Sequence, residues 1–242
     1  MKKILLFIAI ASAAFSCSDD DSSKNPASEP VSLPSKITIH NEIDVKTVYN
    51  LTYDAKRRIQ NLTRSSDGVN VDAELIYSYN DKDMIEGCDF VMGNTTMRLT
   101  FGYNNSDMLQ SLQLEDETFP IAYSSVTQLY TGASVAIKLN DNGDLSHVNS
   151  IDFMHSSDKK GVFNSVVGKN FQLNNLYIDI VGAQQLFLFF GSRSAIENTI
   201  SAAAESNYDY TTTYDEAGYP SHIEIRSQNA LVYDAKIEYT NQ

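Results

Sequence analysis

The stretch Tyr214-Asp215-Glu216-Ala217-Gly218 is the clearest copy of a short unit that returns several times along the chain. Each unit has an aromatic or apolar residue at its origin and an Asp or Asn directly after it. The four other copies have their origins at Tyr53, Tyr79, Tyr103 and Leu139. We call these five copies the turn units and count positions from the origin residue.

The residues before each origin follow an alternating pattern. Positions minus two and minus four are mostly apolar, and the positions between them are mostly polar. A period of two places one set of side chains on a buried face and the other towards water, so each unit is predicted to begin as a β-strand. The alternating residues are Leu51 and Tyr49, Tyr77 and Leu75, Phe101 and Leu99, Ile137 and Val135, and, in the fifth unit, Thr212 and Tyr210.

The residues after each origin predict a turn. An Asp or Asn side chain accepts a hydrogen bond from the backbone two residues on, which starts a turn. Position plus four, where a positive φ is wanted, holds Gly143 and Gly218, the tolerable Asp83 and Asp107, and the less suitable Arg57. Positions plus six and plus nine are both apolar although their parity differs, so the returning strand needs a β-bulge just after the turn. Each unit is therefore predicted to be a β-hairpin, repeating about every 24 residues.

These hairpins predict a mainly β fold, an antiparallel meander that forms a strongly curved sheet or barrel over residues 35–242. A further strand pair with an irregular link is expected between Phe119 and Thr131. The last strand, Leu231 to Tyr239, alternates with period two. If it pairs with its neighbour and with the first strand, the sheet closes into a barrel.

The repeat stops at Ser156, and residues 156–207 form an insert. Leu186–Phe190 is apolar on every side and must be buried. Ile196 and Ile200 stand four residues apart and are followed by alanines, so Ser192–Ser206 is predicted to be helical. We expect this partly helical, apolar insert to pack on the concave face of the sheet as a plug. A filled core is the expected outcome, and a binding pocket at the edge of the insert is the alternative.

The first residues have the layout of a secretory signal peptide. Lys2 and Lys3 precede an apolar run, so residues 1–16 are predicted to be removed. The sequence Ala14-Phe15-Ser16-Cys17 resembles a bacterial lipobox, which implies that Cys17 is acylated; an ordinary cleaved signal with an incidental cysteine is the alternative. Residues 17–34 are acidic and rich in Ser, Pro and Asn, which is typical of a flexible tether.

Composition limits the partners. The chain has 242 residues and a formal net charge of −13, which becomes −15 once the two lysines of the signal peptide are lost. A charge of this sign argues against nucleic acid and against adsorption to anionic lipid. Cys88 has no second cysteine to pair with if Cys17 is acylated, and its inward position predicts a buried free thiol.

A family resemblance rests on these same motifs. The Tyr-Asp-x-x-Gly frame resembles the YD repeats of RHS-type proteins. The chain from the lipobox through Asp158-Lys159-Lys160 and Phe163 to the apolar insert resembles a group of uncharacterised Bacteroidetes outer-membrane lipoproteins. This resemblance implies a porin-like antiparallel barrel over about residues 35–240 and no assigned chemistry. The acidic residues after Cys17 resemble the export signal of lipoproteins that reach the cell surface, with the periplasmic face as the alternative.

The sequence offers one weak metal-binding candidate. His147, Asp152 and His155 are the nearest approach to a clustered ligand set, and a solvated surface is the simpler interpretation. The segment Asn140–Asp144 looks like a calcium loop, but it lacks the expected Gly and the final acid and occupies the turn of the fourth unit. No nucleotide-binding or nucleophile fingerprint is present, so no cofactor is expected.

Three functional hypotheses follow. The first is a surface-anchored, non-catalytic binding or accessory module that works beside outer-membrane proteins or glycan. The second is a carrier for an apolar ligand held in the sheet interior beside Phe187, Phe189 and Phe190. The third is a hydrolase acting on glycan or lipid, because any two of the 31 acidic residues could converge as a catalytic pair.

Overall fold

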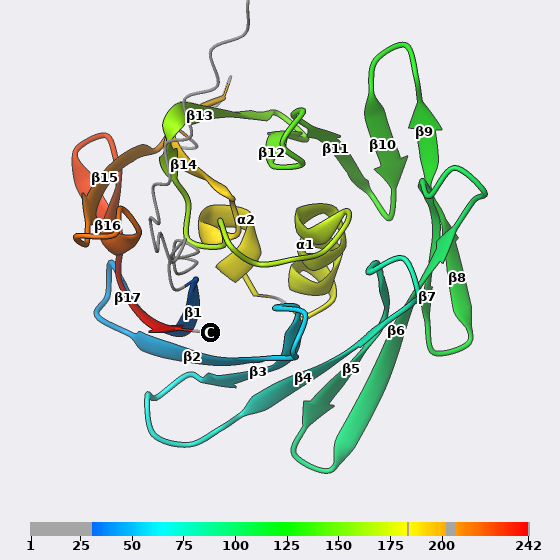
Figure 1. Cartoon of the computed structure of the whole chain (residues 1–242), viewed down its shortest axis with the longest axis horizontal. Helices are drawn as coiled ribbons and strands as arrows, with labels where there is room; N and C mark the ends of the chain where they lie inside the picture. Colours follow the sequence, from blue (N-terminus) through cyan, green and yellow to red (C-terminus); the bar gives the residue numbers. More distant parts are fainter. Residues whose placement is uncertain (1–30, 183, 202–206, 242) are drawn as a thin grey trace, which may run out of the picture. The chain divides into compact units, whose positions relative to one another are not determined.

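The computed structural model describes residues 31–182, 184–201 and 207–241, and in that range the chain forms a 17-stranded antiparallel sheet curved into a nearly closed barrel (Figure 1). The first half of the barrel comprises β1 (Ser32–Asn41), β2 (Lys46–Tyr53), β3 (Ile59–Ser65), β4 (Ala73–Tyr79), β5 (Ile85–Met92), β6 (Thr95–Tyr103), β7 (Leu109–Leu114), β8 (Glu117–Pro120) and β9 (Ala122–Ser124). The second half comprises β10 (Leu129–Gly132), β11 (Val135–Leu139), β12 (Leu145–Val148), β13 (Ile151–Lys160), β14 (Ser194–Ser201), β15 (Asp209–Tyr214), β16 (Pro220–Ser227) and β17 (Ala230–Asn241). The mainly β prediction is confirmed.

The ring is closed by pairing between its first and last strands. β17 pairs antiparallel with β1 from Ser32 opposite Asn241 to Asn41 opposite Tyr233, and β1 also pairs with β2. On the other side of the barrel, β8 pairs with β7 while β9 pairs with β10, and only Ile121 separates β8 from β9. The chain therefore bends at Ile121, so that it pairs first with one half of the sheet and then with the other. The pair of β9 and β10 confirms the strand pair with an irregular link that was expected between residues 119 and 131.

The five turn units form the predicted turns. In each, the side-chain oxygen of the Asp or Asn accepts two backbone N–H groups, from the residues two and four positions later, at 2.8–3.1 Å. Position plus four has a φ between 60° and 81° in every unit, including Arg57. The predicted bulges are also present, because one extra residue of each returning strand interrupts the register. The extra residues are Gln60, Glu86, Gln110, Ser146 and Ser221.

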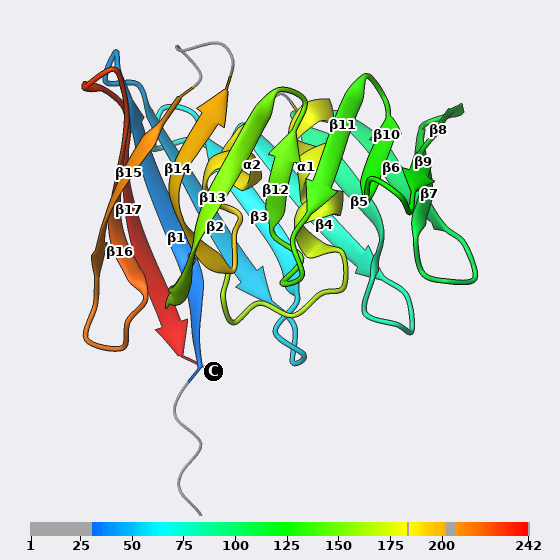
Figure 2. The same ribbon diagram turned by 90° about the horizontal axis from the view of Figure 1, so that it is seen from above.

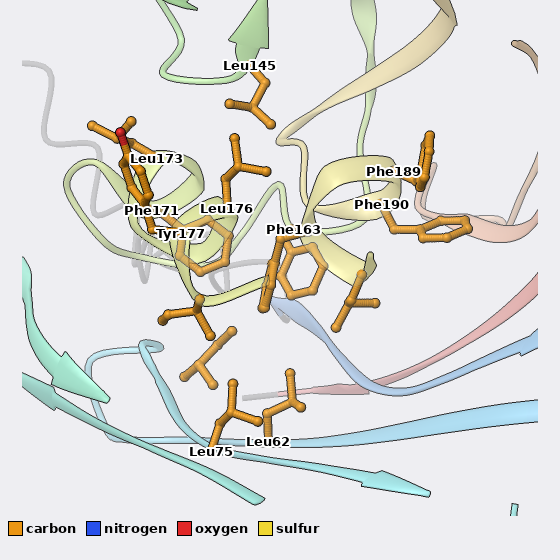
Figure 3. Packing of buried hydrophobic residues seen from close by; sticks show 14 of the residues in the cluster. Leu62, Leu75, Leu145, Phe163, Phe171, Leu173, Leu176, Tyr177, Phe189 and Phe190 are labelled. Carbon is orange, nitrogen blue, oxygen red and sulfur yellow. The ribbon is translucent and has the colours of Figure 1, made fainter. Parts of the chain in front are cut away.

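The insert fills the interior of the barrel. Its helices α1 (Phe171–Val181) and α2 (Leu186–Phe190) lie inside the ring of strands (Figure 1). The rings of Phe163, Phe171 and Phe187 stand 5.4–5.8 Å apart. Figure 3 shows Phe163 on the side of the plug that is turned towards the strand residues Leu62 and Leu75. Phe163 and Phe187 are fully buried, so the expected plug and filled core are confirmed.

The predicted helix Ser192–Ser206 is wrong where the structure describes it. Ser194–Ser201 is strand β14, paired with β13, and Ile200 is 54% exposed on it rather than sharing a buried face with Ile196. β-branched residues favour the strand. β14 pairs with β13 and with β15, and these strands supply the backbone hydrogen-bond partners that a helix would have provided internally. The alanines after Ser201 lie outside the described residues. The insert within the barrel is correspondingly shorter than predicted, because β13 and β14 belong to the sheet.

One end of the barrel is sealed by the segment that leads into the plug. We call residues 161–170 the strap. Val167 donates its backbone N–H to the Arg57 carbonyl at 3.0 Å, and Lys169 donates its own to the Asp83 carbonyl at 3.3 Å. The strap therefore binds the carbonyls of the left-handed turn residues, at the end of the barrel that carries the five turns (Figure 2). We call the opposite end the mouth.

The N-terminal strand enters at the turn end. β1 begins at Ser32, three residues before the predicted domain start, and Leu33 is fully buried. The Tyr53 hydroxyl donates to the Pro34 carbonyl at 2.7 Å, which fixes this segment beside the first turn. The predicted signal peptide, Cys17 and the tether up to residue 30 lie outside the described residues. In the part of the chain that is described, no helix is long and apolar enough to cross a membrane.

Candidate functional site: a pocket at the mouth of the barrel

A pocket of about 270 Å³ opens at the mouth. Its wall is built by the first three strands, the link between the two helices, α2 and the start of β17. We call it the mouth pocket. Its lining residues are Ile39, Asn41, Val45, Thr47, Tyr49, Arg64, Ser66, Gln184, Gln185, Leu186, Phe189, Phe190 and Tyr233.

Aromatic rings form one wall of the mouth pocket. Phe189 and Phe190 of α2 are buried, and Tyr233 of β17 lies over them with ring centroids at 5.3 and 6.4 Å. The Tyr233 ring is only partly buried, and its hydroxyl donates to the Gln185 side-chain oxygen. The plug thus holds a tyrosine ring in a fixed position at the rim.

The second feature of the pocket is the side-chain amide of Gln184, which has no hydrogen-bond partner among the described residues. Gln184 is 7% exposed, and neither its Nε2 nor its Oε1 has a hydrogen-bond partner among the described residues. Its backbone N–H donates to the Asp179 carbonyl at 2.8 Å, which holds the residue at the end of α1. An unpaired buried polar group costs about 1–3 kcal/mol, so a hydrogen-bond partner for this amide would be stabilising.

The charges around the mouth pocket are few. Arg64 is the charged residue of the lining, and its Nε donates to Asp72 at 2.7 Å. Burial, followed by the negative charge of Asp179, raises the pKa of Tyr49 well above its usual range, so the Tyr49 phenol stays protonated. Among the described residues of the lining there is no carboxylate, imidazole or thiol.

Asp179 is a buried acid on the helix that leads to the pocket. Its Oδ2 accepts the backbone N–H groups of Phe187 at 2.7 Å and Leu188 at 3.0 Å, so it caps the start of α2. Its Oδ1 has no partner among the described residues. Burial raises the pKa of Asp179 to about 7, although the two N–H donors oppose that shift.

The structure brings together only part of the predicted metal candidate. His147 and Asp152 are cross-strand neighbours, with Nδ1 and Oδ1 at 2.7 Å on the outer surface. His155 does not join them. Its Nε2 is buried and has no partner in the described ranges, and burial lowers the pKa of His155 while the Asp144 carboxylate opposes that shift. The segment Asn140–Asp144 is the turn of the fourth unit, as predicted.

A different group has ligand atoms close enough for a cation. Within the described ranges, His222, Glu224 and Asp234 place one ligand atom each within 4.8 Å of one another. They are half-buried on the outer face of β16 and β17, where Arg226 already binds the Glu224 carboxylate at 2.9 Å and His222 contacts Asp234 at 3.1 Å. Side-chain partners within the protein account for all three residues.

Cys88 is a buried free thiol, as predicted. Burial raises the pKa of the Cys88 thiol far above its usual range, so it stays protonated and unreactive. The sequence analysis gave a pocket at the edge of the insert only as the alternative, and it did not single out Gln184. The sequence feature that could have indicated Gln184 is the polar Gln184-Gln185 pair beside the apolar run that follows it. The strands that line the pocket with this pair could not be predicted, because they depend on how the barrel closes.

Comparison with known proteins gives a structural likeness. No protein-family model matches the chain, and no curated protein matches it. Two solved structures are similar to it, a porin-like protein from Bacteroides uniformis with 15% identity and one from Bacteroides vulgatus with 12% identity. The first match covers 86% of this chain and 98% of the other with a TM-score of 0.43, and the second covers 87% and 99% with a TM-score of 0.44. The expected likeness to porin-like proteins is thus found, while lipoprotein and YD-repeat membership stay predictions.

Proposed function

We propose that this protein is a lipid-anchored, non-catalytic binding module at the outer membrane, and that its ligand occupies the mouth pocket. The observation that carries this proposal is the buried Gln184 amide on the wall of a pocket of about 270 Å³, because neither of its polar atoms has a hydrogen-bond partner among the described residues. A concave site with aromatic walls and a few polar groups is the usual form of a small-molecule site.

The chemistry of the lining supports binding rather than catalysis. General acid–base and nucleophilic catalysis need a titratable group within hydrogen-bond reach of the reacting atoms. The mouth pocket offers amides, hydroxyls, protonated phenols and one ion-paired guanidinium. These groups bind and orient a ligand without transferring a proton near neutral pH, so the hydrolase hypothesis has no support at this site.

The outer face of the barrel supports a separate anchor. It carries ion pairs such as Arg98–Asp89 at 2.6 Å, Arg226–Glu224 at 2.9 Å and Lys36–Glu238 at 2.9 Å, while the inner face packs against an apolar plug. Strands that span an outer membrane have the reverse arrangement, apolar outside and polar within. A barrel with this surface suits water, and the predicted acyl groups on Cys17 would hold it at the membrane.

The start of the described chain and the mouth pocket lie at opposite ends of the barrel. β1 enters at the turn end with Ser32 and reaches the mouth with Asn41, ten residues that span about 30 Å in a strand.

The apolar-carrier alternative loses its cavity. The lumen beside Phe187 is filled, and the remaining space between Phe189, Phe190 and strands β14 to β16 is only about 10 Å³. That volume is about the size of one water-sized probe. Of these two spaces beside α2, the mouth pocket is the one with room for a ligand, and its wall is partly polar.

Two measurements test the proposal. Treating intact cells with protease should remove the domain from wild-type cells, and a Cys17→Ala variant should leave the membrane fraction. Native mass spectrometry of the detergent-free Cys17→Ala chain should show an added mass that denaturation releases. A protein protected from protease in intact cells would refute the surface location, and a bare mass under native conditions would count against a retained ligand.

A further inference from the structure

We infer that the mouth pocket binds a neutral saccharide through a single sugar ring. This inference rests on the proposed function of the pocket as the ligand site and adds the chemical class of the ligand. Three properties of the pocket carry it: its charge, its hydrogen-bonding groups and its half-exposed aromatic ring.

The charge balance disfavours an ionic ligand. Arg64 is the charged residue of the lining, and Asp72 holds its guanidinium at 2.7 Å with 19% of the Arg64 side chain exposed. The pair leaves the pocket without net charge, and the chain as a whole carries −13. A phosphate or carboxylate would find no uncompensated cation there and would approach against the overall field.

The hydrogen-bonding groups suit hydroxyls. A sugar hydroxyl both donates and accepts, and it therefore satisfies an amide that offers an N–H donor on one side and a carbonyl acceptor on the other. The Gln184 side chain has both groups, and neither group has a hydrogen-bond partner within the part of the chain that the structure describes. Thr47, Ser66 and Asn41 add further polar groups along the same wall. A purely apolar ligand would leave the Gln184 amide unpaired and would therefore bind at a cost.

The aromatic wall suits the C–H face of a sugar ring. Tyr233 presents a partly exposed ring that is backed by the buried rings of Phe189 and Phe190, and its hydroxyl is fixed by Gln185. A rigid aromatic platform gives contact area at low conformational cost. The Gln184 amide and the Tyr233 ring line the same cavity, so one sugar ring can meet both.

The volume limits the ligand to a small group. At about 270 Å³ the cavity lies just below the range of about 300–1,000 Å³ that encloses drug-sized ligands. It has room for one sugar ring, and the adjoining sugar rings of a longer saccharide would lie in solvent at the open rim.

The test uses the full-length Cys17→Ala chain, whose single change lies outside the described barrel. Methyl glycosides of glucose, galactose, mannose and N-acetylglucosamine are the saccharide probes, with sodium laurate and sodium phosphate as the apolar and anionic probes. Binding is measured by saturation-transfer NMR and by calorimetry. We expect at least one glycoside to bind and both other probes to give no signal.

Matched variants locate the binding. Gln184→Met keeps the side-chain length and removes the amide, and Tyr233→Ala removes the platform; each should weaken glycoside binding by about tenfold or more. Tyr233→Phe keeps the ring and should bind within about threefold of the parent. His147→Ala, on the outer surface, should leave binding unchanged, and circular dichroism with a melting curve confirms that every variant is folded.

The outcomes separate this inference from the proposed function. Laurate or phosphate binding that Gln184→Met abolishes would overturn the saccharide class while keeping the pocket as the site. Glycoside binding that survives Gln184→Met and Tyr233→Ala would overturn the location. If no probe binds and native mass spectrometry gives a bare mass, both the ligand class and the proposed function fail.

Discussion

The tyrosine at the origin of a turn unit ties neighbouring hairpins together. The hydroxyl of Tyr79 donates to the Ile59 carbonyl at 2.8 Å, and that of Tyr103 donates to the Ile85 carbonyl at 2.6 Å. Each acceptor is the residue at position plus six of the preceding unit, just past its turn. A Tyr-Asp pair therefore serves two purposes: the Asp or Asn shapes its own turn, and the Tyr fastens that turn to the hairpin before it.

Tyr103 also receives a hydrogen bond from the plug, and this predicts a graded series of variants. Asn174 of α1 donates to the Tyr103 hydroxyl at 2.9 Å. Tyr79→Phe removes one hydrogen bond and should lower the free energy of unfolding by about 1 kcal/mol. Tyr103→Phe leaves both Ile85 and Asn174 unpaired and should cost more, about 2 kcal/mol, while Tyr103→Ala should cost about 3–5 kcal/mol through the added cavity.

Urea denaturation followed by fluorescence measures this series. The exposed Tyr123, replaced by Phe, is the control and should change the free energy of unfolding by less than about 0.5 kcal/mol. Equal losses for Tyr79→Phe and Tyr103→Phe would mean that the bond to the plug contributes nothing to stability.

Among the larger elements, α1 is fastened to the barrel by polar side chains in a buried setting. Gln172 accepts the Leu145 backbone N–H at 2.6 Å, and Asn175 accepts the Tyr77 hydroxyl at 2.8 Å. These side chains are buried on the helix together with Asp179. Each hydrogen bond forms at only one position of the helix in the lumen. These bonds therefore fix where α1 lies along the barrel, in addition to the apolar packing that keeps it inside.

Asp179 makes the stability of the plug depend on pH. Its pKa is raised from 3.8 to about 7 in the folded protein, so the folded state binds a proton more tightly than the unfolded state between those values. Stability must therefore fall as pH rises from about 4 to about 7, by roughly 4 kcal/mol in total for this group. Asp179→Asn keeps an oxygen acceptor for the N–H groups of Phe187 and Leu188 and should remove this dependence.

The measurement is the difference in unfolding free energy between Asp179→Asn and the parent across that pH range. We expect the variant to gain stability relative to the parent as pH rises and the gain to level off above pH 7. A constant difference from pH 4 to pH 7 would show that Asp179 titrates at its ordinary value in the folded state.

The features that could be predicted from the sequence are those that depend on residues close together in the chain. Turn residues at fixed spacing specify the five hairpins, and conflicting parity at positions plus six and plus nine specifies the bulges. The strand Ser194–Ser201 escaped prediction because its identity depends on β13 and β15 as partners. The helix α1 escaped because its buried polar side chains interrupt the apolar pattern that marks a buried helix. The pocket could be predicted only as an alternative, since Arg64, Gln184 and Tyr233 meet through the closed ring alone.

In the whole barrel, the first strand β1 and the last strand β17 pair with each other, and each also has a second neighbouring strand. We call this pair of strands the closing seam. β1 and β17 are paired along their length, whereas β8 and β9 each pair on one part of a short, exposed segment. Amide protection follows the opening of such units. Hydrogen exchange read by mass spectrometry should therefore find β1 and β17 as slow as β4 and β5, and β8 and β9 much faster. Rapid exchange in β1 and β17 would mean that the ring is open between them in solution.

The closing seam has a consequence for biogenesis. Ser32 of β1 bonds to Asn241 of β17 across a separation of 209 residues, so the first strand to be synthesised receives its β17 partner last. Until the final residues emerge, β1 keeps an unpaired edge and Leu33 has no complete core to enter. Folding dominated by such distant pairing is slow. A chain that is synthesised in this order needs protection from aggregation until β17 is complete, and a translation stop just a dozen residues early would remove β17 and leave the barrel open.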